Sequence, residues 1–198
     1  MTIDDDVCLP GLEEASPAGR SPAGSLGRML SFGFVVAVVL ALVLMLGYGL
    51  ASKQGNTGNS LLAREAPNFT LELFDGNTLT LSDMRGQPVV VNFWASWCPT
   101  CREEAADLEN VWQDYKDRGV VFVGVNVSDT RSDALDYIKE FDITYSNGPD
   151  RGKEIYDAYG VTGFPETFFV NRQGIVVRKF VGPLDEQTLA AFVEDFLQ

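Results

Sequence analysis

Two cysteines separated by two residues carry the clearest chemical signal in this sequence. Cys98 and Cys101 lie where an apolar stretch ends and a helical pattern begins. At a helix start, unpaired backbone N–H groups and the positive helix end favour a thiolate. We therefore expect the pKa of Cys98 to lie below the ordinary value of about 8.5, with Cys101 close enough to form a reversible disulfide. A pair of structural, buried cysteines is the alternative.

The composition excludes several other kinds of chemistry. The chain has 198 residues, a net charge of −13, three cysteines and no histidine. Nucleic acid is not an expected partner, because phosphate binding needs a basic face. A structural zinc site needs four Cys or His ligands, and histidine-based catalysis is impossible. We expect no metal and no cofactor beyond the redox-active Cys98–Cys101 disulfide.

The N-terminal part of the chain differs in composition from the rest. Residues 1–28 are rich in Gly, Pro, Ser and acidic residues, which predicts a disordered tail. Residues 29–51 carry no charge and are long enough for the roughly 20 residues that cross a bilayer. We interpret them as a transmembrane signal-anchor helix; a signal peptide cleaved near residues 49–51 is the alternative. Residues 52–65 are expected to form a flexible tether.

Residues 66–198 have the alternating patterns of a folded α/β domain. Pro88–Ala95 is apolar almost throughout, which is typical of a strand buried on both faces. A strand–helix–strand unit should be parallel and right-handed, and a final hairpin adds antiparallel strands. The sequence thus predicts a central mixed sheet flanked by helices, with an N-terminal β-hairpin extension. The other predicted elements are strands Phe69–Leu73, Thr78–Leu81, Val120–Val127, Thr167–Val170 and Ile175–Val181, and helices Pro99–Arg118, Ser132–Phe141, Lys153–Tyr159 and Asp185–Leu197.

Two sequence blocks together resemble the thioredoxin superfamily, and more closely its membrane-anchored TlpA/ResA/CcmG (DsbE) branch. The first block is Val91–Ala95 followed by Trp97–Cys101, and the second is Gly160–Val170. The resemblance covers about residues 66–198 and implies a thioredoxin-like fold. It also implies reduction of disulfides on the outer face of the membrane. In CcmG-like members this reduction serves cytochrome c maturation, with electrons from a CcdA- or DsbD-type membrane protein.

The same resemblance indicates where a substrate would bind. Pro165 is the candidate cis-proline, because a bond preceding proline is where the cis form costs least. Phe164 could offer backbone groups to an extended substrate segment beside the cysteines. Trp97, Pro99 and Thr100 complete the candidate substrate-binding set. For Trp97 a role in filling the core is an equal alternative.

Two carboxylates are candidate catalytic groups. Glu104 lies one helical turn past Cys101, and Glu166 follows Pro165. Either could accept the Cys101 proton during exchange. Glu104 matches an acid thought to assist catalysis in ResA-like members, although a solvated helix face is the alternative. Asn92 stands where many thioredoxins carry Asp; it cannot take a proton, which leaves that role to Glu104 or Glu166.

These features predict a reductase of protein disulfides in a bacterial cell membrane. The domain is expected outside the cytoplasm, where disulfides persist, with the N-terminus and Cys8 inside. The expected partners are a disulfide-containing exported protein, apocytochrome c being the leading case, and the membrane electron donor. An oxidase or isomerase of exported proteins and a non-catalytic binding module are alternatives. A thiol peroxidase is disfavoured, because Ala95 stands where such enzymes need Thr.

Overall fold

The structure is a computed structural model and describes residues 37–45 and 61–197. Residues 37–45 are helical and belong to an N-terminal unit separate from the folded domain. Within the described residues, no helix is both long and apolar enough to span a membrane. The rest of the predicted 29–51 anchor, the 1–28 tail and residues 52–60 lie outside the described part, so these interpretations stay predictions.

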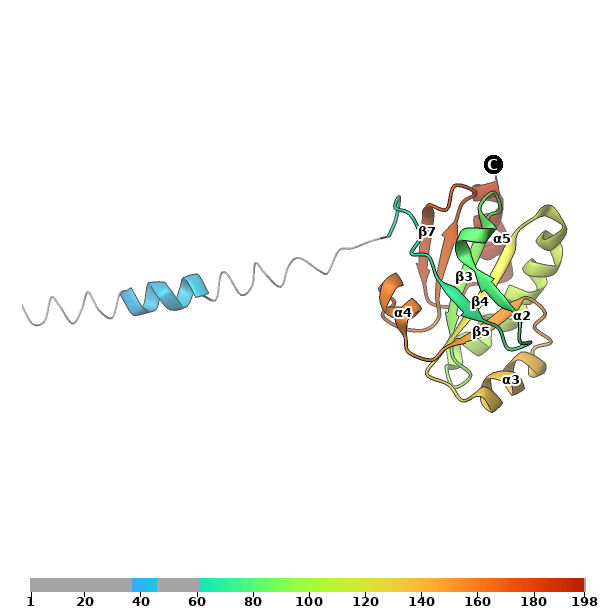
Figure 1. Ribbon diagram of the computed structural model, residues 1–198, viewed down its shortest axis with the longest axis horizontal. Helices are drawn as coiled ribbons and strands as arrows, with labels where there is room; N and C mark the ends of the chain where they lie inside the picture. Colours follow the sequence, from blue (N-terminus) through green and yellow to red (C-terminus); the bar gives the residue numbers. More distant parts are fainter. Residues whose placement is uncertain (1–36, 46–60, 198) are drawn as a thin grey trace, which may run out of the picture. The chain divides into compact units, whose positions relative to one another are not determined.

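A five-stranded mixed sheet in the order β5-β4-β3-β6-β7 forms the centre of the domain (Figure 1). The middle strand β3 (Val89–Trp94) is buried at all six positions, as its apolar run predicts. It pairs in parallel with β4 (Val121–Val127) and antiparallel with β6 (Glu166–Val170). β5 (Ser146–Asp150) extends the sheet beyond β4, and β7 (Val176–Val181) extends it antiparallel to β6. The predicted thioredoxin-like arrangement is confirmed.

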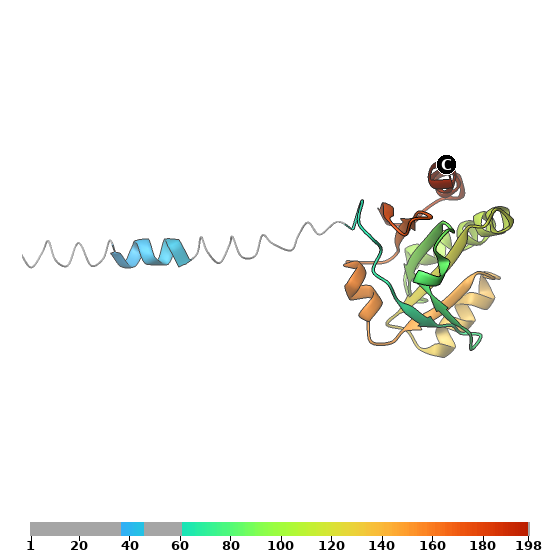
Figure 2. The same cartoon turned by 45° about the horizontal axis from the view of Figure 1, so that its top comes forward.

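Three helices cover one face of this sheet and build the larger core cluster. They are α2 (Pro99–Tyr115), α3 (Arg131–Glu140) and α5 (Glu186–Leu197). Helices α2 and α5 lie side by side, as Figure 2 shows. The α2 helix tightens into a 3-10 turn, η2 (Lys116–Arg118), before Gly119 ends it with φ +80°. A left-handed residue is the common way to terminate a helix, which is why glycine stands there.

The other face carries the smaller elements and the second core cluster. The predicted N-terminal hairpin is present as β1 (Thr70–Glu72) and β2 (Thr78–Thr80), followed by a 3-10 helix η1 (Leu81–Met84). The short helix α4 (Glu154–Tyr159) covers the same face. Alternate residues of β3 thus enter two different cores, because successive side chains of a strand point to opposite faces.

The edge strand β5 was not predicted from the sequence. Its Ser-Asn-Gly-Pro-Asp composition is poor in strand-forming residues, and Pro149 has no N–H to donate. An edge strand tolerates proline because one side of it needs no partner. Gly148 is also required by space: a Cβ there would lie 2.4 Å from the Glu72 carbonyl oxygen. The hairpin packs this closely on β5 because Gly148 has no side chain.

The folded domain begins earlier than the predicted boundary at Ala66. Ala63 N–H donates to the Val176 carbonyl at 2.8 Å, and Val176 N–H donates to the Arg64 carbonyl at 2.8 Å. Ala63 and Arg64, which the sequence assigns to the tether, are therefore bonded to Val176 at the start of β7. Both hydrogen bonds join backbone groups, so the side-chain pattern of the sequence could not reveal them.

Replacing Gly148 by Ala should destabilise the domain through its contact with the hairpin. We expect a loss of about 2 kcal/mol in the free energy of unfolding, in the usual range for overpacked positions. Urea unfolding of the full chain measures this loss. The matched control is Gly163→Ala, whose Cβ would have no atom within 4 Å, and which should stay within about 1 kcal/mol of wild type. Equal effects at both positions would contradict the close packing on β5.

Candidate active site

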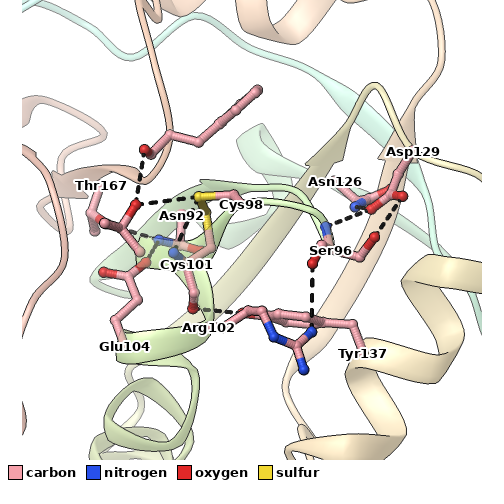
Figure 3. The surroundings of a disulfide bond; sticks show 12 residues. Asn92, Ser96, Cys98, Cys101, Arg102, Glu104, Asn126, Asp129, Tyr137 and Thr167 are labelled. Carbon is pink, nitrogen blue, oxygen red and sulfur yellow. Dashed lines mark hydrogen bonds between the residues drawn. A yellow bond between two sulfur atoms is a disulfide. The ribbon is translucent and has the colours of Figure 1, made fainter.

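The two cysteines form a disulfide at the start of α2 (Figure 3). Their Cα atoms are 5.3 Å apart, and Cys98 is the N-cap residue of the helix. The Cys98 Sγ accepts the backbone N–H of Cys101 at 3.1 Å. The same N–H is available to stabilise a thiolate once the bond is reduced. Cys98 is 3% exposed and Cys101 is fully buried, so solvent and substrate reach Cys98 first.

Glu104 is buried on the same side of the sheet as the disulfide. Its side chain is 1% exposed, so the alternative of a solvated helix face is wrong. Its Oε1 accepts the Asn92 side-chain N–H at 2.8 Å, and its Oε2 accepts the Leu184 backbone N–H at 2.9 Å. Burial raises the pKa of Glu104 to about 7, although the two hydrogen bonds oppose that rise; Asp107 adds to it. A carboxyl group with this pKa can take up and release a proton near neutral pH.

Asn92 has a role that the sequence did not reveal. Its side-chain Nδ2 donates to Glu104 and also to the Thr167 hydroxyl, at 3.0 Å. Figure 3 shows this amide close to the disulfide, with the Glu104 carboxyl group beside it. The sequence identified Asn92 only as a missing acid. In the structure it is the direct partner of the acid that is present.

The structure does not bring Glu166 together with Glu104. Thr167 faces α2 with Asn92, so the preceding residue of the strand points to the opposite face of the sheet. There the buried Glu166 carboxylate forms an ion pair with Lys179 and accepts the Thr162 backbone N–H at 3.1 Å. These contacts fix the loop that leads into Pro165. These contacts do not join Glu166 to the cysteine pair, so its catalytic role stays a prediction.

The predicted substrate-binding residues gather around the disulfide. The Phe164–Pro165 bond is cis. The Thr100 hydroxyl, 3.4 Å from Cys98 Sγ, donates to the Phe164 carbonyl at 3.4 Å. The Trp97 ring meets the Phe164 ring edge to face at 5.7 Å. Trp97 is 59% exposed, which excludes the alternative that it fills the core, and Pro99 is exposed as well.

Two further residues hold the active-site segment and were missed. Asp129 accepts the N–H and the hydroxyl of Ser96 at 2.7 and 2.8 Å and the Asn126 amide at 2.9 Å. Tyr137 donates its hydroxyl to the Cys101 carbonyl at 2.7 Å. Asp129 directly follows the region where β4 ends beside β3, and functional residues of α/β sheets collect at these strand ends. That rule could have found Asp129, whereas nothing in the sequence indicated Tyr137.

No group of metal ligands was found in the part of the chain that the structure describes. In residues 37–45 and 61–197, no three His, Cys, Asp or Glu side chains lie close enough together to hold a metal ion. The chemistry visible at the site is that of the cysteine pair and the Glu104 carboxyl group.

The class of protein follows from the fold and the cysteine pair together. A cysteine pair joined as a disulfide at the first turn of a helix, on a mixed sheet of this order, is the arrangement of a thioredoxin-like thiol–disulfide oxidoreductase. Comparison with known proteins agrees with this class. A redoxin family profile matches residues 62–194, and the chain belongs to that family.

Individual relatives define the class of oxidoreductase more narrowly. The chain is 32% identical over 157 residues to the thiol-disulfide oxidoreductase ResA of Bacillus subtilis, covering 77% of this chain and 86% of that protein. It is 38% identical over 164 residues to the thiol:disulfide interchange protein DsbE of Allochromatium vinosum, covering 80% and 88%. A crystal structure of a thioredoxin family thiol:disulfide interchange protein from Chlorobium tepidum superposes with a TM-score of 0.64 at 29% identity, covering 68% and 96%. The chain is therefore a thiol–disulfide oxidoreductase of the ResA/DsbE type.

The raised pKa of Glu104 predicts a stability that falls as pH rises. Between the ordinary value of 4.5 and about 7, the unfolded chain releases the proton while the folded chain keeps it. The free energy of unfolding of the oxidised full chain should thus drop by about 3 kcal/mol through this interval and then level off. Urea unfolding at a series of pH values measures the drop.

The matched variant is Glu104→Gln, which is neutral at every pH. Its stability should lose this pH dependence, so that it gains relative to wild type between pH 5 and pH 8. Glu103→Gln, at the exposed neighbouring position, should follow the wild-type curve. Parallel curves for wild type and Glu104→Gln would show that Glu104 titrates normally.

Proposed function

We propose that this oxidoreductase works as a reductase of disulfides in exported proteins, with apocytochrome c as the leading substrate. The observation that carries the proposal is the buried Glu104 carboxyl group beside a helix-capped cysteine pair. Glu104 can accept the proton that Cys101 releases during exchange, and its negative charge affects the reduction potential of the cysteine pair.

The exchange begins with Cys98 as nucleophile. Its thiolate attacks a substrate disulfide, forms a bond to one substrate sulfur and displaces the other as a thiolate. The Cys101 thiol then passes its proton to the Glu104 carboxylate and attacks Cys98 Sγ. The mixed disulfide breaks, the second substrate sulfur leaves as a thiolate, and the Cys98–Cys101 bond forms. Two electrons have moved to the substrate, and the two substrate thiolates take protons from solvent.

The charge of Glu104 favours the reducing direction. A carboxylate close to the sulfurs disfavours a thiolate and so destabilises the reduced form of the pair. A less stable reduced form gives its electrons away more readily, and about 30 mV corresponds to about 1.4 kcal/mol. The buried position of Glu104 strengthens this effect, because little solvent screens the charge.

The substrate surface would be formed by the residues beside Cys98. The exposed Trp97 ring offers an apolar contact. Next to Pro165, the Thr100 hydroxyl is hydrogen-bonded to the Phe164 carbonyl. An extended segment of the substrate could run along this backbone, as peptides do when they bind to main-chain groups.

The proposed location is the outer side of a bacterial cell membrane. The uncharged residues 29–51 support a single-pass anchor, with residues 1–28 and Cys8 in the cytoplasm. Disulfides persist outside the cytoplasm, so a reductase has substrates there. Each turnover leaves the pair oxidised, and a CcdA- or DsbD-type membrane protein is the proposed source of the electrons that restore it.

The reduction potential of the cysteine pair tests the direction. We expect the full chain to have a potential below about −200 mV, measured against glutathione or a reference dithiol at pH 8. At that pH Glu104 is charged, so Glu104→Gln should raise the potential by about 30 mV or more. The exposed Glu103→Gln is the matched control and should leave it unchanged. A wild-type reduction potential near about −120 mV, the value of the strong oxidant DsbA, would indicate an oxidase instead.

Trapping of mixed disulfides tests the partners and the location. Cys101→Ser leaves Cys98 unable to resolve its bond to a substrate, so substrates should accumulate covalently on the full chain in cells. Non-reducing gels and mass spectrometry identify them; exported proteins, apocytochrome c among them, are the expected result. Cys98→Ser should trap none. A set of purely cytoplasmic partners would refute the proposed location.

A further inference from the structure

The buried Asn92 side chain lies between the Glu104 carboxyl group and the Thr167 hydroxyl. Both of these groups can act as hydrogen-bond donor or acceptor. It is buried in β3, opposite Thr167 in the register of β3 and β6. Its Nδ2 donates to the Glu104 carboxylate and to the Thr167 hydroxyl, at 2.8 and 3.0 Å. Figure 3 shows that the amide, the carboxyl group and the Thr167 side chain lie next to one another beside the disulfide.

Proton uptake by Glu104 changes what these partners must do. As a carboxylate it only accepts, and its two oxygens meet the donors Asn92 Nδ2 and Leu184 N–H. As a carboxylic acid it also donates one hydrogen bond, which neither N–H can receive. An unpaired buried donor is costly, so a second arrangement of the partners is favoured.

We propose that Asn92 is a two-way positioning residue for Glu104. Its amide nitrogen donates to the carboxylate, and after a half turn its Oδ1 accepts a hydrogen bond from the O–H of the carboxylic acid. The Thr167 hydroxyl then donates to Oδ1 or turns to another acceptor, because a hydroxyl can serve in both senses. The inference rests on the proposed role of Glu104 as acceptor of the Cys101 proton.

The two-way arrangement explains why an amide suits this position. Aspartate at position 92 would place a second carboxylate against Glu104, and two such groups tend to share one proton. An apolar residue would pair with neither state of Glu104. Asparagine has nearly the same shape in both orientations, so the proton can arrive and leave without a movement of α2 or β3.

The titratable groups that face Glu104 come from several elements. Cys101 and Asp107 lie on its own helix, Tyr137 lies on α3, and Tyr145 lies just before β5. The pKa values of Tyr137 and Tyr145 are raised, first by burial and also by the charge of Glu104, so both stay protonated. Asp107 raises the pKa of Glu104 and is present in every variant below.

The first test is carried out on the wild-type full chain in detergent, in the oxidised form. NMR follows the Asn92 side-chain amide and the Glu104 carboxyl carbon from pH 9 to pH 5. We expect the Asn92 amide signals to shift at the same pH at which Glu104 titrates, and the Nδ2 protons to lose their contact with the Thr167 side chain. The Asn126 amide, which donates to Asp129, is the control and should stay unchanged. An Asn92 amide that keeps its contacts while Glu104 titrates would overturn the inference.

The second test uses Asn92→Leu, which keeps the branched shape without polar atoms. A two-way partner supports both states, so its removal should lower Tm by a similar amount at pH 5 and pH 9. The protonation equilibrium of Glu104 should then change less than about threefold. A partner that only donates would give a larger Tm loss at pH 9 and a change of about tenfold or more towards the protonated form. Asn126→Leu, the matched control, should leave this equilibrium unchanged.

A measurement of thiol exchange separates this inference from the proposed function. The reduced wild-type chain is mixed with a small peptide disulfide before the titrations. Failure of that exchange would contradict the proposed function itself. Intact exchange with a fixed Asn92 amide would contradict only the two-way role, and the wild-type titration decides this even if Asn92→Leu does not fold.

Discussion

The buried carboxyl group of Glu104 joins three parts of the fold at one point. It lies on α2, one oxygen accepts a side-chain N–H from β3, and the other accepts the backbone N–H of Leu184 before α5. Burial of a carboxyl group is costly unless its oxygens are paired, and here both are. The position of α2, and with it the cysteine pair at its first turn, therefore depends on partners 12 and 80 residues away in the sequence.

The active-site segment is held from outside as well as by its own helix. Ser96 is bonded to Asp129 after β4, and the Cys101 carbonyl is bonded to Tyr137 on α3. Trp97 donates its indole N–H to the Ser128 carbonyl at 3.0 Å. The backbone around the disulfide is thus fixed by two neighbouring elements. Oxidation and reduction can then alter the sulfurs and nearby protons while the loop keeps its place, which is the preorganisation that exchange chemistry benefits from.

Much of this arrangement could be predicted because its signals are local. The apolar run of β3, the helical pattern of α2 and the spacing of Cys98 and Cys101 each depend on adjacent residues. The burial of Glu104 could not be predicted, since it depends on Leu184, 80 residues further on. β5 was missed because Ser146–Asp150 lacks strand-forming residues and is placed by its neighbours. Glu104 and Glu166 lie on opposite faces of the sheet. Predicting this would have required the register of β3 and β6, which the sequence pattern alone did not supply.

The two outer strands of the sheet are each partly covered by the N-terminal segment of the domain. Backbone bonds from residues 63–66 occupy the start of β7, and the Phe74 N–H donates to the Asn147 carbonyl on β5 at 2.9 Å. Extended segments of other chains carry unpaired backbone groups. Open strand edges would capture such segments by sheet extension, whatever their sulfur chemistry. By shortening both open edges, the same stretch of chain leaves less of β5 and β7 available for pairing with another strand.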